Sequence, residues 1–149
     1  MTPATWPDVE RHLAALPRTQ VAAACARAAR HALPAVAALE AAFGPEAREW
    51  AAACERSLVT VEGFADGLPV SGFKLRVAAE TARCAAAATA DAARRHGPSP
   101  LVEAAELAFA AVAFAADACR AEQPGRAATL AMQGCRAAYG GGPVPASLM

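Results

Sequence analysis

The chain of 149 residues has little of what nucleic-acid binding requires. The basic residues Lys and Arg and the acidic residues Asp and Glu number 14 each, so the formal net charge is zero. Because proteins that bind nucleic acid normally carry a positive field, we expect no DNA or RNA partner.

Motifs of common catalytic and cofactor sites are also missing from the sequence. None of its serines stands in a G-x-S-x-G turn, and no glycine-rich phosphate loop follows a strand pattern. The three histidines, His12, His31 and His96, are far apart, and none belongs to the E-x-x-H pair that builds di-iron centres in helical bundles. We therefore predict a protein that is not an enzyme, with no catalytic residue, no cofactor and no metal site.

Long apolar segments are absent as well. The longest uncharged apolar run within a helical pattern, residues 107–116, has about half of the roughly 20 residues needed to cross a bilayer. The first residues show neither a basic start with an apolar run nor a small-residue cleavage site. We expect no membrane partner and a cytoplasmic location.

Alanine is what the sequence has in abundance. The hydrophobic fraction is 56%, and alanine supplies most of it. Alanine is the best helix former, whereas Val, Ile, Thr and aromatic residues nowhere alternate as they do in strands. The sequence therefore predicts an all-α fold, an antiparallel bundle of five to six Ala-rich helices with no β-sheet.

Proline and glycine divide the chain into segments. Pro34 falls within one of them and predicts a kink or break at residues 31–33, because proline removes a backbone hydrogen bond and clashes with the preceding turn. We predict a single bundle domain over residues 1–139 and a flexible Gly/Pro tail over 140–149. The predicted helices cover residues 6–16, 19–43, 45–66, 71–96, 99–122 and 126–139.

Hydrophobic spacing assigns inner and outer faces to these helices. In the helix over 45–66, the three- and four-residue steps place Trp50, Cys54 and Leu58 inside and Val59 outside. In the helix over 99–122, Ala110 and Ala113 fall on the polar, outward stripe. These assignments leave a few apolar side chains on the predicted surface.

Charge alternates from helix to helix. Residues 45–66 hold five acids against two bases, residues 71–96 hold five bases against two acids, and residues 99–122 are acidic again. Two interpretations remain open: ordinary pairing within the bundle, where each exposed pair contributes little, or an acidic helix face that docks a basic partner. The residues predicted to make that partner contact are Glu55, Glu62, Glu103 and Asp117.

Five cysteines stand at positions 25, 54, 84, 119 and 135, with no C-x-x-C pair. We interpret them as reduced, small core residues, which is the usual role of a free cysteine. Because nearly every long helix carries one, a bundle that turned several thiolates inward could instead hold a soft metal such as Cu(I).

Part of the sequence resembles a known class of proteins. The resemblance lies in Cys25-Ala26-Arg27 leading to Leu33-Pro34, in a helix that carries Trp50 and ends Phe64-Ala65-Asp66-Gly67, and in Ala-rich helices through Ala115-Ala116-Asp117-Ala118. Over roughly residues 20 to 120 the chain is similar to the all-α immunity proteins of bacterial polymorphic toxin systems. It also resembles a set of Ala-rich helical domains that occur as many paralogues in GC-rich bacterial genomes.

The sequence thus favours a non-enzymatic helical bundle that binds another protein. The resemblance implies an immunity or antitoxin protein, or an adaptor, of a bacterial conflict or defence system, with a toxin or effector as partner. One alternative is a self-assembling structural bundle, a homo-oligomer in which exposed alanines and Val59 pack between subunits. A second alternative is a copper-binding bundle lined by cysteines.

Overall fold

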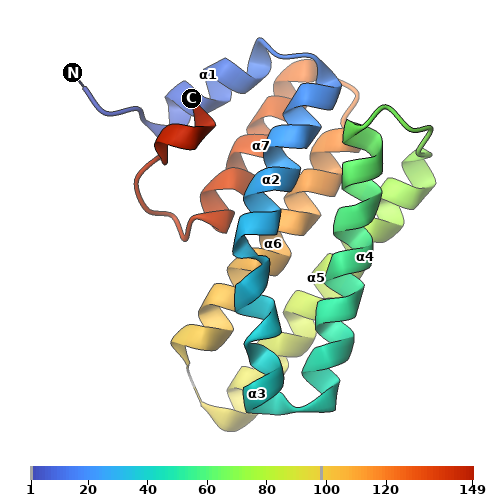
Figure 1. The fold of residues 1–149 in the computed structure, drawn as a ribbon, viewed down its shortest axis with the longest axis vertical. Coiled ribbons are helices and arrows are strands. Elements are labelled where there is room, and N and C mark those ends of the chain that lie inside the picture. Colours follow the sequence, from blue (N-terminus) through green and yellow to red (C-terminus); the bar gives the residue numbers. More distant parts are fainter. Residues whose placement is uncertain (1, 98) are drawn as a thin grey trace.

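A computed structural model describes residues 2–97 and 99–149 of the chain, and these residues contain helices and no strand. Figure 1 shows long helices that run alternately down and up the molecule, as in an antiparallel bundle. The predicted all-α fold is confirmed. The elements are α1 (Trp6–Ala14), α2 (Arg18–Ala37), α3 (Leu39–Phe43), α4 (Pro45–Ala65), α5 (Gly72–His96), α6 (Pro100–Arg120), α7 (Pro124–Ala138) and the short 3-10 helix η1 (Ala146–Leu148).

Local sequence signals fix most helix ends. The Ser71 Oγ accepts a hydrogen bond from the backbone N–H of Lys74 at 3.1 Å, and the Ser99 Oγ accepts one from Leu101 at 3.2 Å. These serines satisfy backbone donors that the first turns of α5 and α6 leave without a partner. Gly44 lies between α3 and α4 with φ of 73°, a backbone conformation that favours glycine.

Of the kink or break predicted at residues 31–33, the break is wrong and the kink stays a prediction. Helix α2 continues through Pro34 to Ala37, and the chain turns at Ala38 before α3 begins. The N–H of Ala38 still donates to the carbonyl of Pro34 at 3.1 Å. Proline removes only its own donor, and the bundle on which α2 packs supplies enough burial to keep the helix intact around it.

Helix α6 lies at the centre of the bundle. It packs against α2, α4, α5 and α7, and it buries residues on nearly every side. Ala113, predicted to face outward, is 5% exposed. The predicted polar stripe was too wide because α6 has helices on several sides and little of its surface reaches solvent. Alanine can be buried there because its side chain has no polar group that needs a hydrogen-bond partner.

Helix α7 fills the groove between α2 and α6, and α1 packs on α7 (Figure 1). The chain after α7 folds back toward α1, where the Trp6 Nε1–H donates to the carbonyl of Gly142 at 2.9 Å. Val144 and Leu148 pack against the core. Residues 140–149 thus lie along α1 and α7 in this structure, and their predicted flexibility stays a prediction.

None of the helices in residues 2–97 and 99–149 combines the length and the apolar character that crossing a membrane requires.

Gly134 allows α6 and α7 to approach closely. A Cβ at this position would stand 3.0 Å from the Cβ of Phe114, 3.3 Å from the carbonyl oxygen of Ala111 and 3.3 Å from the Sγ of Cys25. The first two of these atoms belong to or adjoin the backbone of α6, so they move only if the helix moves. Close packing between α6 and α7 therefore depends on the missing methyl group.

We predict that Gly134→Ala lowers the free energy of unfolding by about 1 kcal/mol or more, because overpacking outweighs the gain in helix propensity. Gly63→Ala in α4 is the matched control, since a Cβ there meets nothing closer than 3.7 Å. The control should raise stability by about 0.5–1 kcal/mol. Urea unfolding of both variants measures the difference, and equal gains in stability would contradict the close approach.

Candidate functional site

Two of the predicted partner-binding acids, Glu55 and Glu62, lie together on α4 and pair with Arg30 of α2. The Arg30 Nη1 lies 2.7 Å and 2.6 Å from the two Glu55 carboxylate oxygens, and its Nη2 pairs with Glu62. The hydrogen bonds that Arg30 donates, first to Glu55 and then to Glu62, raise the pKa of Arg30. The two acids therefore share one cation along the seam between α2 and α4, and Arg30 offsets one of their two negative charges.

The other two predicted acids lie elsewhere. Asp117 on α6 pairs with Arg83 of α5 and lies 3.8 Å from Arg120, and only 18% of its side chain is exposed. Glu103 stands in the exposed first turn of α6 and forms no ion pair within residues 2–97 and 99–149. The four residues do not form one surface, and Glu103 is the one whose charge an internal cation does not offset. Whether they contact a partner stays a prediction.

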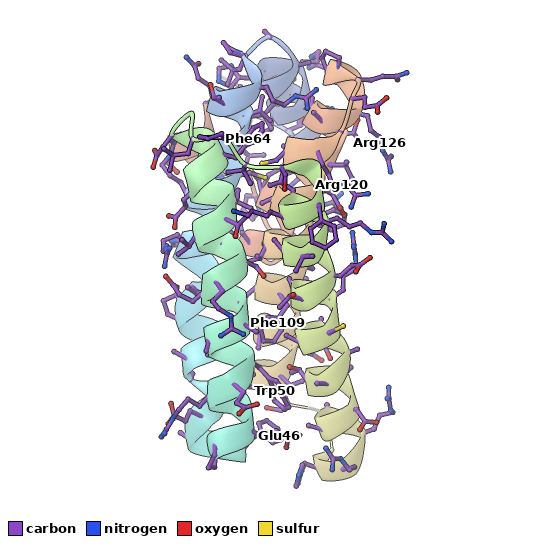
Figure 2. The ribbon with its side chains drawn as sticks, turned by 90° about the vertical axis from the view of Figure 1, so that its right-hand side faces the viewer. Glu46, Trp50, Phe64, Phe109, Arg120 and Arg126 are labelled. Carbon is purple, nitrogen blue, oxygen red and sulfur yellow. The ribbon has the colours of Figure 1, made fainter. Side chains whose placement is uncertain are left out.

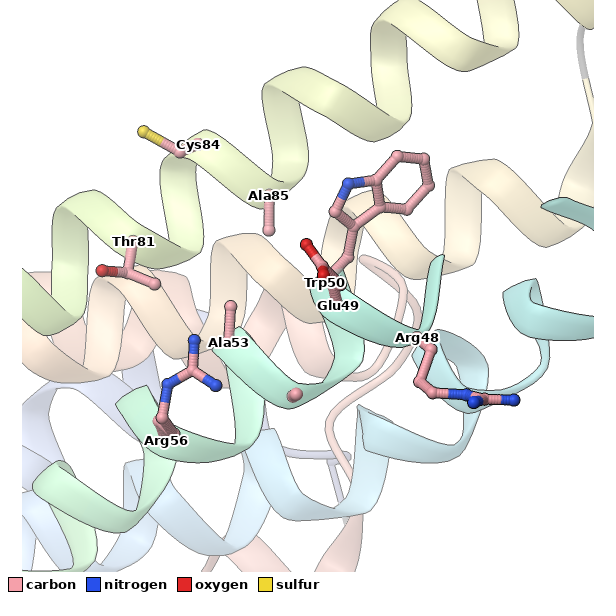
Figure 3. Close-up of a pocket in the computed structure, with 9 residues that line it drawn as sticks. Arg48, Glu49, Trp50, Ala53, Arg56, Thr81, Cys84 and Ala85 are labelled. Atoms are coloured by element: carbon pink, nitrogen blue, oxygen red, sulfur yellow. The ribbon is translucent and has the colours of Figure 1, made fainter. Parts of the chain in front are cut away.

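A groove lies between α4 and α5, with a volume of about 620 Å³. Figure 3 shows the Trp50 indole standing between the two helices, Ala53 and Ala85 facing one another farther along, and Arg56 beside them. Both walls come from α4 and α5 alone. We call this the α4–α5 groove; it is lined by Arg48, Glu49, Trp50, Ala52, Ala53, Arg56, Thr81, Cys84 and Ala85.

Exposed apolar side chains extend the same two helix faces. Val59 lies one turn beyond Arg56 on α4 and is 55% exposed, while Phe73 and Val77 precede Thr81 on α5 at four-residue steps and are 74% and 45% exposed. Large apolar residues at this exposure are unusual when they gather along one seam. The α4–α5 groove and these three residues together form an apolar surface with basic and acidic side chains at its edge.

On the opposite side of the bundle, a comparable groove between two helices is occupied by a third helix. There α7 lies between α2 and α6 and buries a face of small residues against them. In Figure 2, which looks onto α4 and α5, no helix covers the space between them. The residues of α7 that are buried in its own groove are Ala127, Ala128, Leu130, Ala131, Gly134 and Cys135.

The cysteines fall into different environments. Cys84 is exposed in the α4–α5 groove, which corrects the interpretation of all five as core residues, and the other four are buried. Burial raises the pKa of Cys54 and of Cys119 to about 12. In the part of the chain that the structure describes, no three His, Cys, Asp or Glu side chains gather closely enough to hold a metal ion. The copper-binding alternative stays a prediction.

Sequence reasoning identified Val59 as an outward apolar residue but missed the groove beside it. Phe73 and Val77, four residues apart and in register with Cys84, were a signal that could have marked the α5 wall. The α4 wall consists largely of alanines, which look the same in sequence whether they line a core, a groove or an open surface. Only the arrangement of the helices separates these cases.

We predict that a bulky maleimide at about pH 8 modifies Cys84 of the folded protein at least about tenfold faster than any other cysteine. Cys54 and Cys119 are buried, and with pKa values of about 12 only about one thiol in ten thousand is ionised at that pH. Mass spectrometry of tryptic peptides locates the label, and Cys84→Ser is the control. Equally rapid labelling of a buried cysteine would contradict the arrangement described.

Comparison with known proteins finds no family model, no curated protein and no solved structure that matches this chain.

Proposed function

We propose that this protein is a non-enzymatic helical bundle that binds another protein, and that the α4–α5 groove receives an α-helix of that partner. The observation that carries the proposal is the uncovered groove of about 620 Å³ with apolar residues exposed along it. Recognition of this kind, in which a helix lays its apolar face into a groove, is a recurrent mode of protein binding.

The chain itself supports a helix as the occupant. Helix α7 packs in the groove between α2 and α6 through alanines, a leucine and a glycine, and the α4–α5 groove presents Ala52, Ala53 and Ala85 in a similar way. Small side chains on both partners allow two helix backbones to come close. The expected partner segment therefore carries a stripe of small and medium apolar residues, flanked by an acid that can meet Arg56.

For the biological setting, the proposal relies on the sequence. The resemblance of residues 20–120 to all-α immunity proteins supports an immunity, antitoxin or adaptor role in a bacterial conflict or defence system, with a toxin or effector as the partner. Five free cysteines suit a reducing compartment such as the cytoplasm. We accordingly propose a cytoplasmic protein that neutralises or recruits its partner by contact rather than by chemistry.

A specific observation also favours a second candidate, the self-assembling bundle. Val59, Phe73 and Val77 lie on the same apolar surface, and another copy of the chain could cover them. Sedimentation velocity across a wide concentration range separates the two candidates. A monomer at high concentration contradicts self-assembly, whereas a dimer broken by Phe73→Ser contradicts a groove reserved for a different protein.

The probe for the binding proposal is the protein encoded by each gene that directly neighbours the gene of this chain. We predict that Ala52→Trp, which fills the groove from an exposed position on α4, weakens binding by at least about tenfold, or about 1.4 kcal/mol. Gln133→Trp, at an exposed position of α7, is the matched control and should bind as the parent does. Isothermal titration calorimetry measures both, and thermal melts verify that each variant folds.

Two results would count against the groove. One is an Ala52→Trp variant that binds like the parent protein. The other is a loss of binding with Gln133→Trp alone, which would place the contact on the α7 side. Failure of the parent protein to bind the neighbouring gene product, together with a monomeric state, would remove the protein-binding proposal in its present form.

The four predicted acids lead to a separate test in the same assay. We expect Glu103→Gln to slow association with a basic partner about two- to fivefold at low salt, because an exposed charge attracts its partner at long range and so acts mainly on the association rate. Glu55→Gln, Glu62→Gln and Asp117→Asn should change that rate less, since arginines already offset these charges. Stopped-flow kinetics at two salt concentrations measures the effect; the reverse order would contradict it.

A further inference from the structure

Two thiols meet where α2 packs on α7. Cys25 and Cys135 are 110 positions apart in sequence, yet Cys25 of α2 packs against the turn of α7 that ends at Cys135. The Sγ of Cys25 also lies 3.6 Å from the carbonyl oxygen of Ala131, one turn before Cys135. Gly134 contributes to this contact, because a Cβ there would stand 3.3 Å from the Cys25 Sγ.

The two cysteines differ in their surroundings. Cys25 is enclosed by packed helices. Cys135 instead borders a cavity of about 310 Å³ between α1, α2 and α7, and His12, Gln20 and Arg27 also line this cavity. The end of the chain, residues Ser147 to Met149, forms another wall of this cavity. The Cys135 side chain itself is 0% exposed, so only a reagent close to water in size can reach its sulfur without displacing that wall.

The contact also orders the ionisation of the two thiols. The pKa of Cys25 is raised, first by its side-chain interaction with Cys135 and then by burial. The pKa of Cys135 is lowered, first by its side-chain interaction with Cys25, and the positive charge of Arg27 acts in the same direction against the effect of burial. Cys135 is therefore the first of the pair to become a thiolate, which is the nucleophilic form.

We propose that Cys25 and Cys135 form a peroxide-reactive thiol pair, in which Cys135 is the sulfur oxidised by hydrogen peroxide and Cys25 resolves it to a disulfide joining α2 and α7. The pair stands apart from the α4–α5 groove and does not depend on the function proposed for that groove.

The chemistry takes place in two steps. The Cys135 thiolate attacks one oxygen of hydrogen peroxide, the O–O bond breaks, and the leaving hydroxide takes up a proton to become water, so that Cys135 becomes a sulfenic acid. The Cys25 sulfur, giving up its proton, then attacks the Cys135 sulfur, the S–O bond breaks, and a second water leaves. The two thiols lose two electrons and two protons, and one peroxide becomes two waters.

Cys119 is the neighbouring thiol that the proposal excludes. Its charge acts on Cys25, so it lies in the vicinity, but it does not border the cavity, and burial raises its pKa to about 12. It is therefore the matched control for the pair, being a buried cysteine in the same region with neither access nor an ionised sulfur.

Trypsin separates the three cysteines, which makes the test direct. Residues 19–27 hold Cys25, residues 127–136 hold Cys135 and residues 96–120 hold Cys119, each as the one cysteine of its peptide. The reduced full-length protein is treated with hydrogen peroxide, the remaining thiols are alkylated, and the digest is analysed by mass spectrometry. We expect peptide 19–27 linked to peptide 127–136, and reduction should release both.

Variants check the order of events. Cys25→Ala should stop the reaction at the Cys135 sulfenic acid, which a cyclic 1,3-diketone traps, and Cys135→Ala should slow oxidation of Cys25 by at least about tenfold. Cys119→Ala should leave formation of the disulfide unchanged. Circular dichroism before oxidation shows that each variant is helical, and native separation of the parent protein in both redox states shows that the link is intramolecular.

Three outcomes would overturn the proposal. They are a link between peptides 19–27 and 96–120, oxidation confined to Cys84, and a Cys25–Cys135 link that forms as fast with a bulky disulfide oxidant as with peroxide. None of these results bears on binding in the α4–α5 groove, which is measured separately with Ala52→Trp.

Discussion

Close approach of helices through alanine and glycine is the constraint on which the rest of this structure depends. An alanine-rich interface gains little burial per residue, so it is stable only when many short contacts form at once. Helix α6 meets this requirement by packing against helices on several sides, and Gly134 brings α7 so close to it that an added methyl group would be crowded. The core therefore consists mostly of alanines, with a small number of large side chains such as Phe109 and Leu58 among them.

The same constraint explains where the two candidate sites lie. Helix α7 occupies the groove between α2 and α6, and its tight fit brings Cys135 into contact with Cys25. The groove between α4 and α5 on the other side has no such helix and remains hollow. One groove is thus completed by the chain itself and encloses a thiol pair, while the other is left available to a partner.

Ion pairs with arginine determine which acidic side chains keep an unpaired negative charge on the surface. Arg30 joins α4 to α2, and Arg83 joins α5 to α6, so the alternation of charge along the chain becomes pairing across helix seams. These pairs are exposed enough that each contributes little to stability. Their larger effect is on the surface, because they offset charges that the sequence by itself presents as free and leave Glu103 without an internal partner.

The sequence by itself determined the helical fold and most helix ends, because alanine propensity and the Ser71 and Ser99 caps act over a few neighbouring residues. It also assigned Trp50, Cys54 and Leu58 correctly to the buried face of α4. Only the tertiary structure decided that α2 continues through Pro34, that Ala113 is buried, that the α4–α5 groove is open and that Cys25 meets Cys135. Each of these depends on which helix lies beside which, and alanine, having no distinctive shape or charge, carries almost no information about its neighbour.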